Sequence, residues 1–277
     1  MSALPEVIVP VYNGVDALAA CLDALARCVP EAARVQLIDD ASPDPRVAGL
    51  LAQFHAKASC AVQVHRHDLN QGFVASVNAA IARADGDVVL LNADTVTTAG
   101  WLERLAACAA SDPRIGTATP WSNNAEICSL PEFCVANPLP EDPEAVAAAC
   151  RHAGPPKFPE LPTAVGFCMF IRRAALQAVG DFDVATFGRG YGEENDFCRR
   201  AAGHGWRNVL CDDTWVGHRG GASFAGTGHA PGGENLARLV ARYPGYNALV
   251  ADFIARDPLA PLRARIAACL RPGVTSP

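Results

Sequence analysis

The sequence predicts an α/β fold, in which a mostly parallel sheet carries helices on both faces and is followed by a helical C-terminal tail. Over the first 120 residues, short apolar runs alternate with helical patterns, as is typical of parallel strands joined by covering helices. Beyond residue 230, apolar residues at helical spacing extend from about Glu234 to Leu270 and are punctuated by Pro244, Pro258 and Pro261. This pattern predicts the tail.

The first half of the chain supplies the predicted elements in order. Strands are expected at Glu6–Val11, Val35–Ile38, Ala61–His65 and Asp87–Leu91. Apolar residues recur at three- and four-residue spacing after these runs, as is typical of helices with one buried face. The expected helices cover Leu18–Val29, Val47–Lys57, Gly72–Ala84 and Gly100–Ala110.

Residues 121–162 interrupt this alternation with Trp-Ser-Asn-Asn, several prolines and an Ala-rich helix near Pro143–His152. A loop-rich insertion is therefore expected there. A strand at Ala164–Ile171 resumes the order, and a further helix is expected to start near Glu193.

Composition limits the function. The 277 residues carry a formal charge of −6, with acidic and basic residues mixed, so no nucleic-acid partner is expected. The eleven cysteines form no Cys-x-x-Cys pair, which predicts buried free thiols and a cytoplasmic, reducing compartment. No signal peptide is visible, and no apolar run approaches the ~18 residues of a membrane span. Docking on the inner face of a membrane stays open.

Polar clusters end three of the predicted strands: Pro10-Val-Tyr-Asn-Gly14, Asp39-Asp-Ala-Ser42 and Asn92-Ala-Asp-Thr95. Turn chemistry explains each cluster singly. Because the carboxyl ends of parallel strands share one edge, where ligands bind, the three together predict a nucleotide or metal site. Neither Gly-x-Gly-x-x-Gly after the first strand nor a P-loop is present, which counts against both of those nucleotide sites.

Seven short motifs follow one another along the chain: Val9-Pro-Val-Tyr-Asn13, Asp39-Asp-Ala-Ser42, Asn70-Gln-Gly72, Leu91-Asn-Ala-Asp-Thr95, Gly166-Phe-Cys-Met-Phe-Ile-Arg-Arg173, Gly190-Tyr-Gly-Glu-Glu-Asn-Asp-Phe-Cys-Arg-Arg200 and His218-Arg-Gly-Gly-Ala-Ser-Phe224. In this order and spacing the chain resembles family-2 glycosyltransferases of the GT-A fold over about residues 5–225. It most resembles bacterial rhamnosyltransferase-type enzymes of cell-surface polysaccharide assembly.

The resemblance implies a site for a nucleoside-diphosphate sugar of the UDP, dTDP or GDP type. Pro10, Tyr12 and Asp40 would line the nucleobase pocket. On residue chemistry alone, Tyr12 is better explained as a rim aromatic and Asp40 as a turn residue. The remaining implied donor-site residues are Asn13, Asn70, Gly72, Asn92, Ala93 and Arg200.

The resemblance also implies a divalent cation, Mn²⁺ or Mg²⁺, that bridges the two phosphates. Asp94 would bind it through oxygen, and His218 would be a second ligand that favours Mn²⁺. The chain departs from the family's Asp-x-Asp because Asn92 replaces the first Asp. Without the resemblance, a lone His beside glycines is better explained as an exposed loop residue.

The pair Glu193-Glu194 opens a predicted helix, where acidic residues ordinarily favour the helix dipole. In the family, the second acidic residue at this position is the general base, which implies that role for Glu194, although Asp is commoner there. Asp196 is a competitor, but on a helix it should face away from Glu194. Glu193 and Trp121 are expected on the acceptor side.

The resemblance therefore implies an inverting transfer of a sugar to a hydroxyl of a glycan or lipid-linked glycan. It also implies a GT-A domain over residues 1–230, with a nucleotide-binding half at about 1–120 and an acceptor half at about 121–230, and an extension over 231–277. A sugar-nucleotide pyrophosphorylase is disfavoured because no Gly-rich, basic loop follows the first strand. A non-catalytic nucleotide-sugar-binding or scaffolding module of the same fold ranks second.

Overall fold

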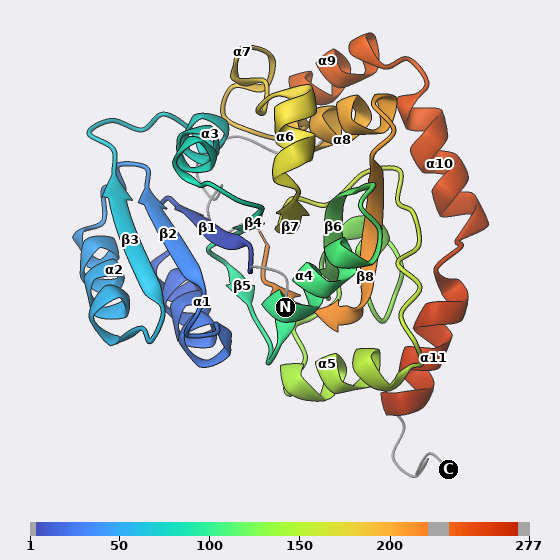
Figure 1. The fold of residues 1–277 in the computed structure, drawn as a ribbon, viewed down its shortest axis with the longest axis horizontal. Helices are drawn as coiled ribbons and strands as arrows, with labels where there is room; N and C mark the ends of the chain where they lie inside the picture. Colours follow the sequence, from blue (N-terminus) through green and yellow to red (C-terminus); the bar gives the residue numbers. More distant parts are fainter. Residues whose placement is uncertain (1–3, 221–232, 271–277) are drawn as a thin grey trace.

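The computed structural model describes residues 4–220 and 233–270. Seven strands form the main sheet: β1 (Glu6–Val11), β2 (Arg34–Asp39), β3 (Ala61–Arg66), β4 (Val88–Leu91), β6 (Ile115–Trp121), β7 (Cys168–Ile171) and β8 (Arg207–Trp215). Their spatial order is β3-β2-β1-β4-β7-β6-β8 (Figure 1). Two short strands, β5 (Thr95–Val96) and β9 (Gly217–His218), pair with each other in a separate ladder.

Helices connect and cover these strands. Those of the first half are α1 (Val15–Cys28), α2 (Pro45–Lys57), α3 (Phe73–Arg83), α4 (Trp101–Ser111), the 3₁₀ turn η1 (Glu126–Cys128) and α5 (Pro143–His152). Those of the second half are α6 (Arg173–Val179), α7 (Val184–Phe187), α8 (Glu193–Gly203), α9 (Glu234–Arg242), α10 (Tyr246–Arg256) and α11 (Ala260–Leu270).

The central strands are buried on both faces because successive side chains point to opposite sides of a sheet. In β1, Val7 and Val9 enter one hydrophobic core while Ile8 enters the other. In β4, Val89 and Leu90 divide in the same way. Helices α1, α2, α4 and α5 contribute to the first core, and α3, α6 and α8 contribute to the second (Figure 1).

The starts of two helices follow from their local sequences, and α2 begins two residues before the predicted Val47. Asp44 accepts a hydrogen bond from the backbone N–H of Arg46 at the start of α2, and Pro45 occupies the first turn. Asp142 and Pro143 begin α5 in the same way. Both helices therefore combine an acidic N-cap with a proline whose missing N–H costs nothing there.

The second half of the sheet differs from the prediction. The strand expected at Ala164–Ile171 is confined to β7, which runs antiparallel to both neighbours, β4 and β6. Strands β6 and β8 were not predicted. They carry buried polar side chains, and the hydroxyl of Thr117 donates to Oδ1 of Asn208 across the pair at 2.8 Å. Apolar patterning does not detect strands of this kind.

The predicted tail is confirmed as three helices that run along one side of the molecule, from α8 to α5 (Figure 1). Pro244 and Pro258 fall between them. Leu262 and Ile266 of α11 join the first core. In the described ranges, no helix has the length and apolar character that a membrane span requires. Every cysteine there is a free thiol, and most are buried, as predicted.

Candidate active site

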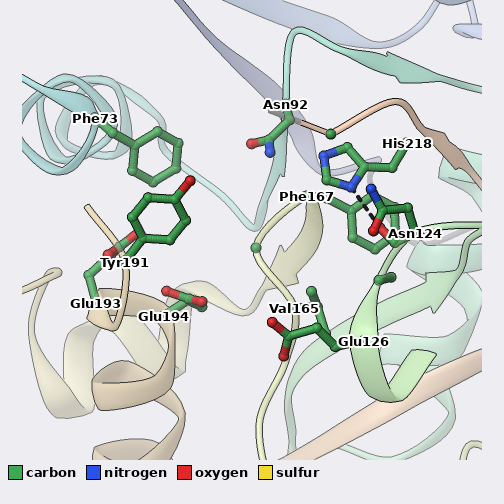
Figure 2. Close-up of a pocket in the computed structure, with 13 residues that line it drawn as sticks. Phe73, Asn92, Asn124, Glu126, Val165, Phe167, Tyr191, Glu193, Glu194 and His218 are labelled. Atoms are coloured by element: carbon green, nitrogen blue, oxygen red, sulfur yellow. Dashed lines mark hydrogen bonds between the residues drawn. The ribbon is translucent and has the colours of Figure 1, made fainter. Parts of the chain in front are cut away.

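A pocket of about 260 Å³ opens at the edge of the sheet where β4 ends (Figure 2). Its wall is formed by Phe73, Asn92, Asn124, Ala125, Glu126, Val165, Gly166, Phe167, Tyr191, Glu193, Glu194, His218 and Gly220. In Figure 2 the aromatic rings of Phe73 and Tyr191 lie on one side, and His218 and Asn124 lie on the other. The pocket thus brings together Asn92, Glu193, Glu194 and His218 from the predicted site.

The β5–β9 ladder places His218 beside Asp94. Thr95 pairs with His218 in antiparallel register, and Nε2 of His218 lies 3.4 Å from Oδ1 of Asp94. A glycine at position 217 permits this approach, because a Cβ there would lie 2.6 Å from Cδ1 of Leu139 and 3.2 Å from Cβ of Val96. Two residues predicted as metal ligands are therefore neighbours.

The other ring nitrogen of His218 fixes which atom faces Asp94. Nδ1 lies 2.7 Å from the carbonyl oxygen of Asn124, which can only accept, so Nδ1 carries the hydrogen. In the neutral ring Nε2 then holds the lone pair, as metal-ligating histidines require. The ring of Phe167 stacks on the imidazole at 5.2 Å between centroids.

The electrostatics of this pair favour positive charge. Asp94 is only 3% exposed. Burial lowers the pKa of His218, but the Asp94 carboxylate and the Asn124 carbonyl raise it, and the net shift is upward. A buried carboxylate that draws a proton to its neighbour is also suited to hold a cation. No group of three or more His, Cys, Asp or Glu side chains with metal-binding geometry occurs within residues 4–220 and 233–270.

Glu193 and Glu194 begin α8 at the pocket, as predicted. Gly192 precedes them with φ of 107°, and its N–H donates to Oε2 of Glu194 at 3.3 Å. The side-chain amide of Asn195 donates to Oε1 of Glu194 at 3.0 Å. Glycine is favoured at 192 because left-handed backbone disfavours other residues and a Cβ there would lie only 3.0 Å from the Phe187 ring.

Both carboxyl groups of this pair have raised pKa values. Burial raises the pKa of Glu193 well above its ordinary value, and the adjacent Glu194 charge adds to the effect. Burial also raises the pKa of Glu194, against the hydrogen bonds that its carboxylate accepts. Carboxyl groups with raised pKa values in a cleft are typical of acid–base sites.

Most of the pocket residues were not predicted as site residues, among them Phe73, Glu126 and Tyr191. Glu126 belongs to η1 and Tyr191 to the glycine-rich loop before α8, and both have positive φ, at 48° and 68°. Backbone strain of this kind clusters at functional sites. In Figure 2 the carboxyl groups of Glu126 and Glu194 extend toward the same space. The glycines around Tyr191 were the available sequence signal, whereas Glu126 had none.

The residues predicted for the nucleobase pocket, and Asn13 of the predicted donor site, lie on the neighbouring part of the edge, at the ends of β1 and β2. Pro10, Tyr12 and Asn13 are half-buried, and the N–H of Asn13 donates to the Ser42 hydroxyl at 3.0 Å. They do not line the pocket of Figure 2. Their contact with a nucleotide stays a prediction.

Asp40 is engaged in holding a loop. Its carboxylate accepts from the backbone N–H groups of Gln71 and Gly72, both at 2.8 Å, and bonds to Nδ1 of His67 at 2.9 Å. Asn70 donates to the Asp40 carbonyl at 3.4 Å. The predicted donor-site residues Asn70 and Gly72 are thus positioned by Asp40, at the start of α3. Ala93 is buried beside Asp94.

Two predicted site residues make structural contacts. Asp196 is fully buried, accepts from Nε of Arg200 at 2.8 Å through one oxygen, and from Arg242 and Tyr243 at 2.7 and 2.9 Å through the other. Arg200 also donates to the backbone carbonyls of Val179, Gly180 and Asp181. The prediction that Asp196 competes as base is therefore wrong, because the residue is fully buried and engaged. A donor contact of Arg200 stays a prediction, although these bonds already hold its guanidinium. Asp196 faces away from Glu194, as helix geometry predicts.

Trp121 is also a core residue. Its side chain is fully buried, and its indole N–H donates to the carbonyl of Asp212 at 3.1 Å. The prediction that it lies on the acceptor side is wrong, because β6 turns the ring into the core. The neighbouring Asn124 reaches the pocket instead. Residues 221–224 of the last motif lie outside the described residues.

The comparison with known families identifies the chain. Residues 6–180, more than half of its length, match glycosyl transferase family 2, and the chain therefore belongs to this family. No curated protein sequence matches it.

Solved structures give the fold, which is GT-A. The chain is similar to GalNAc-T7 with UDP, GalNAc and Mn²⁺, at 16% identity and a TM-score of 0.66 over 96% of this chain and 55% of that one. It is also similar to S. aureus TarS 1-349 in complex with UDP-GlcNAc, at 17% identity and a TM-score of 0.62 over 91% of this chain and 71% of that one. A third similar structure is mannosyltransferase PcManGT from Pyrobaculum calidifontis in complex with GDP-Man and Mn²⁺. The identity is 18% and the TM-score 0.55, over 97% of this chain and 88% of that one. The chain thus spans about half of the GalNAc-T7 chain.

Proposed function

We propose that the chain transfers a sugar from a nucleoside-diphosphate sugar to a hydroxyl group of a glycan or lipid-linked glycan, with inversion. One observation carries this proposal: the edge that holds the Asp94–His218 pair borders the same pocket as Glu194. A leaving diphosphate needs a cation, and an acceptor hydroxyl needs a base. The two requirements would be met by groups on opposite sides of one cavity.

The donor type is supported by the family and by what its structural neighbours bind. Their structures hold UDP, UDP-GlcNAc and GDP-Man. The donor would therefore be of the UDP, dTDP or GDP type. Its nucleobase would lie near Tyr12 and Asp40, and its diphosphate would lie near Asn92 and Asp94. This arrangement follows the rule that open α/β sheets bind ligands beyond the carboxyl ends of their strands.

The residues present fit a divalent cation. Asp94 offers a carboxylate oxygen, and His218 offers the imidazole nitrogen Nε2. Because Nδ1 carries the hydrogen that bonds to Asn124, Nε2 of the neutral ring has the lone pair. Oxygen and imidazole ligands suit Mn²⁺ and Mg²⁺, with imidazole favouring Mn²⁺. When bound, the cation would neutralise the negative charge of the diphosphate leaving group. Asn92 would add a neutral amide oxygen where the family has a carboxylate.

Glu194 would act as the general base. The acceptor hydroxyl gives its proton to the Glu194 carboxylate while its oxygen bonds to the anomeric carbon and the bond from that carbon to the nucleoside diphosphate breaks. Attack opposite the leaving group inverts the anomeric centre in one step. Glu193, whose pKa is raised well above its ordinary value, would hold a proton, which leaves one negative charge on Glu194.

The deciding experiment is a thermal-shift panel of UDP, dTDP, GDP and ADP with and without Mn²⁺, followed by turnover with the matching sugar donor. A ligand at a hundred times its Kd raises the free energy of unfolding by about 2.7 kcal/mol. We expect one nucleotide to stabilise the protein only with Mn²⁺, and Glu194→Gln to keep this shift while losing turnover. Nucleotide binding without turnover in the unsubstituted protein would instead support the non-catalytic module.

A further inference from the structure

Asn195 links the proposed base to the C-terminal helices. Its Nδ2 donates to Oε1 of Glu194 at 3.0 Å. Its Oδ1 accepts from the hydroxyl of Tyr246 at 2.6 Å and from the hydroxyl of Thr163 at 2.9 Å. A hydrogen-bonded chain therefore runs from Tyr246, the first residue of α10, through the Asn195 amide to the carboxylate in the pocket.

This chain fixes which end of the amide faces Glu194. An amide has a donor end and an acceptor end. With two hydroxyl groups donating to Oδ1, the NH₂ group is directed at Glu194. The reversed amide would place an oxygen against the carboxylate oxygen, and both atoms would then be acceptors. The hydroxyl groups of Tyr246 and Thr163 thus keep the NH₂ group of Asn195 directed at the Glu194 carboxylate.

Tyr246 is suited to be a permanent donor. Its ring is buried with Phe187 and Leu239 in a small hydrophobic cluster, so its position does not depend on the hydroxyl alone. Burial and the charge of Glu194 raise the pKa of the Tyr246 hydroxyl further above its ordinary value. The group therefore stays protonated at every pH at which the enzyme would work.

We propose that Tyr246 is a positioning residue for the base: through Asn195 it keeps an amide donor on Glu194, so that the C-terminal extension sets the orientation and proton affinity of a carboxylate it does not touch. This inference rests on the proposed function only for the role of Glu194 in turnover. The hydrogen-bonded chain itself is independent of that role.

Several titratable groups face Glu194, and their influence on its pKa must stay the same in the variant. They are Glu193 and Cys198 on α8, Glu126 on η1, Tyr191 on the preceding loop and Tyr246 on α10. A Tyr246→Phe substitution changes none of these charges. Any change in the proton affinity of Glu194 would therefore come from the loss of the hydroxyl.

The chain offers a matched control in Tyr243. Its hydroxyl also donates to α8, but to Asp196 at 2.9 Å, which points away from Glu194. Tyr243→Phe and Tyr246→Phe each remove one hydroxyl bond between the extension and the same helix. If these bonds only dock the extension, the two variants should behave alike. If Tyr246 positions the base, only Tyr246→Phe should alter its titration.

The first readout is turnover as a function of pH. We expect Tyr246→Phe to lower kcat at neutral pH by about fivefold, the effect of one hydrogen bond, with donor KM unchanged. The acid limb of the kcat profile should move to higher pH because the Asn195 amide, no longer held by Tyr246, would donate less firmly to the charged carboxylate. Tyr243→Phe should leave the limb where it is. Equal profiles for the two variants would overturn the proposal.

A second readout needs no activity. In protein labelled with ¹³C at glutamate Cδ, the Glu194 resonance is assigned by its absence in Glu194→Gln. We expect it to titrate at higher pH in Tyr246→Phe, and at still higher pH in Asn195→Asp, which places a second carboxylate against it. An unchanged titration in Tyr246→Phe would refute the positioning role, whatever Asn195→Asp does. A changed titration in a protein without turnover would uphold it and refute the proposed function instead.

Discussion

Nε2 of His218 lies 3.4 Å from Oδ1 of Asp94, across the ladder in which β9 pairs with β5. The imidazole is locked by its Nδ1–H bond to the Asn124 carbonyl and by stacking on Phe167. A carboxylate and a fixed imidazole nitrogen therefore meet at the edge of the pocket, although they come from distant parts of the chain.

Substitution of Asp94 by Asn tests the cation site. It removes one charge and keeps the shape of the side chain, so we expect the affinity for Mn²⁺ to fall by about 10- to 100-fold. Calorimetric titration of the protein with Mn²⁺ measures this change. Asp85→Asn is the control, because that side chain is 92% exposed and should leave affinity unchanged. An unaltered affinity in Asp94→Asn would show that the cation binds elsewhere.

Restoring the first Asp of the family's Asp-x-Asp should strengthen the proposed cation site. Asn92 lines the pocket, and Asn92→Asp adds a negative charge to it without adding volume. We expect Mn²⁺ to bind about tenfold more tightly. Equilibrium dialysis at several salt concentrations would measure this gain, which should shrink as salt screens the added charge. Weaker binding would mean that position 92 does not face the cation.

Glu194→Gln should abolish the base and spare the fold. We expect kcat to fall by about 10²- to 10⁴-fold, while stabilisation by nucleotide and Mn²⁺ is retained. Because burial raises the pKa of Glu194, activity in the unsubstituted enzyme should rise with pH through a value above that of an ordinary glutamate. Steady-state rates from pH 4 to 8 measure this. Full activity in the variant would exclude Glu194 as base.

Glu193 should destabilise the protein at neutral pH. Burial raises its pKa in the folded state well above its ordinary value, so the folded protein binds this proton more tightly than the unfolded chain does. The associated stability is complete below about pH 4 and is lost as pH rises through the folded pKa. Glu193→Gln should therefore stabilise the protein at pH 8 and have little effect at pH 4. Urea unfolding at both values tests the difference, and equal effects at both would contradict it.

Trp121 should act on stability and not on acceptor binding. Trp121→Phe removes a buried N–H that donates to Asp212 and leaves part of the indole volume empty. The free energy of unfolding should therefore fall by about 1–3 kcal/mol. Trp101 is a matched control: it is fully buried, and its indole N–H has no acceptor in the described part of the chain. Trp101→Phe should cost less. An acceptor KM that rises in Trp121→Phe without loss of stability would contradict this.

Periodicity predicted much of the first half of the fold because its central strands, β1 and β4, are apolar on both faces. Val7, Ile8 and Val9 alternate between two cores, and such runs are visible in the sequence. Strands β6 and β8 were not predicted from apolar periodicity because their buried side chains include the polar residues Thr117, Asn208 and Asp212. The partners of these polar groups lie on other strands and loops, which a linear pattern does not contain.

Motif order located Asp94, His218 and Glu194, but it did not distinguish pocket residues from those that brace the pocket. The spacing of Asp196 and Arg200, four apart on a helix, was the available signal of an ion pair within α8. Nothing local indicated that Arg242 and Tyr243 would complete the environment of Asp196. Glu126 reaches the pocket through a turn with positive φ whose course depends on β6.

The ladder between β5 and β9 also dictates when the site can exist during synthesis. Asp94 emerges early, whereas His218 is contributed by the last strand of the described chain, and domains fold as units during translation. A ribosome that has produced only the first five strands and four helices has made a carboxylate without its imidazole. The nascent chain would therefore complete the proposed cation site, and with it any binding of donor that depends on the cation, only after all seven strands of the main sheet have been made.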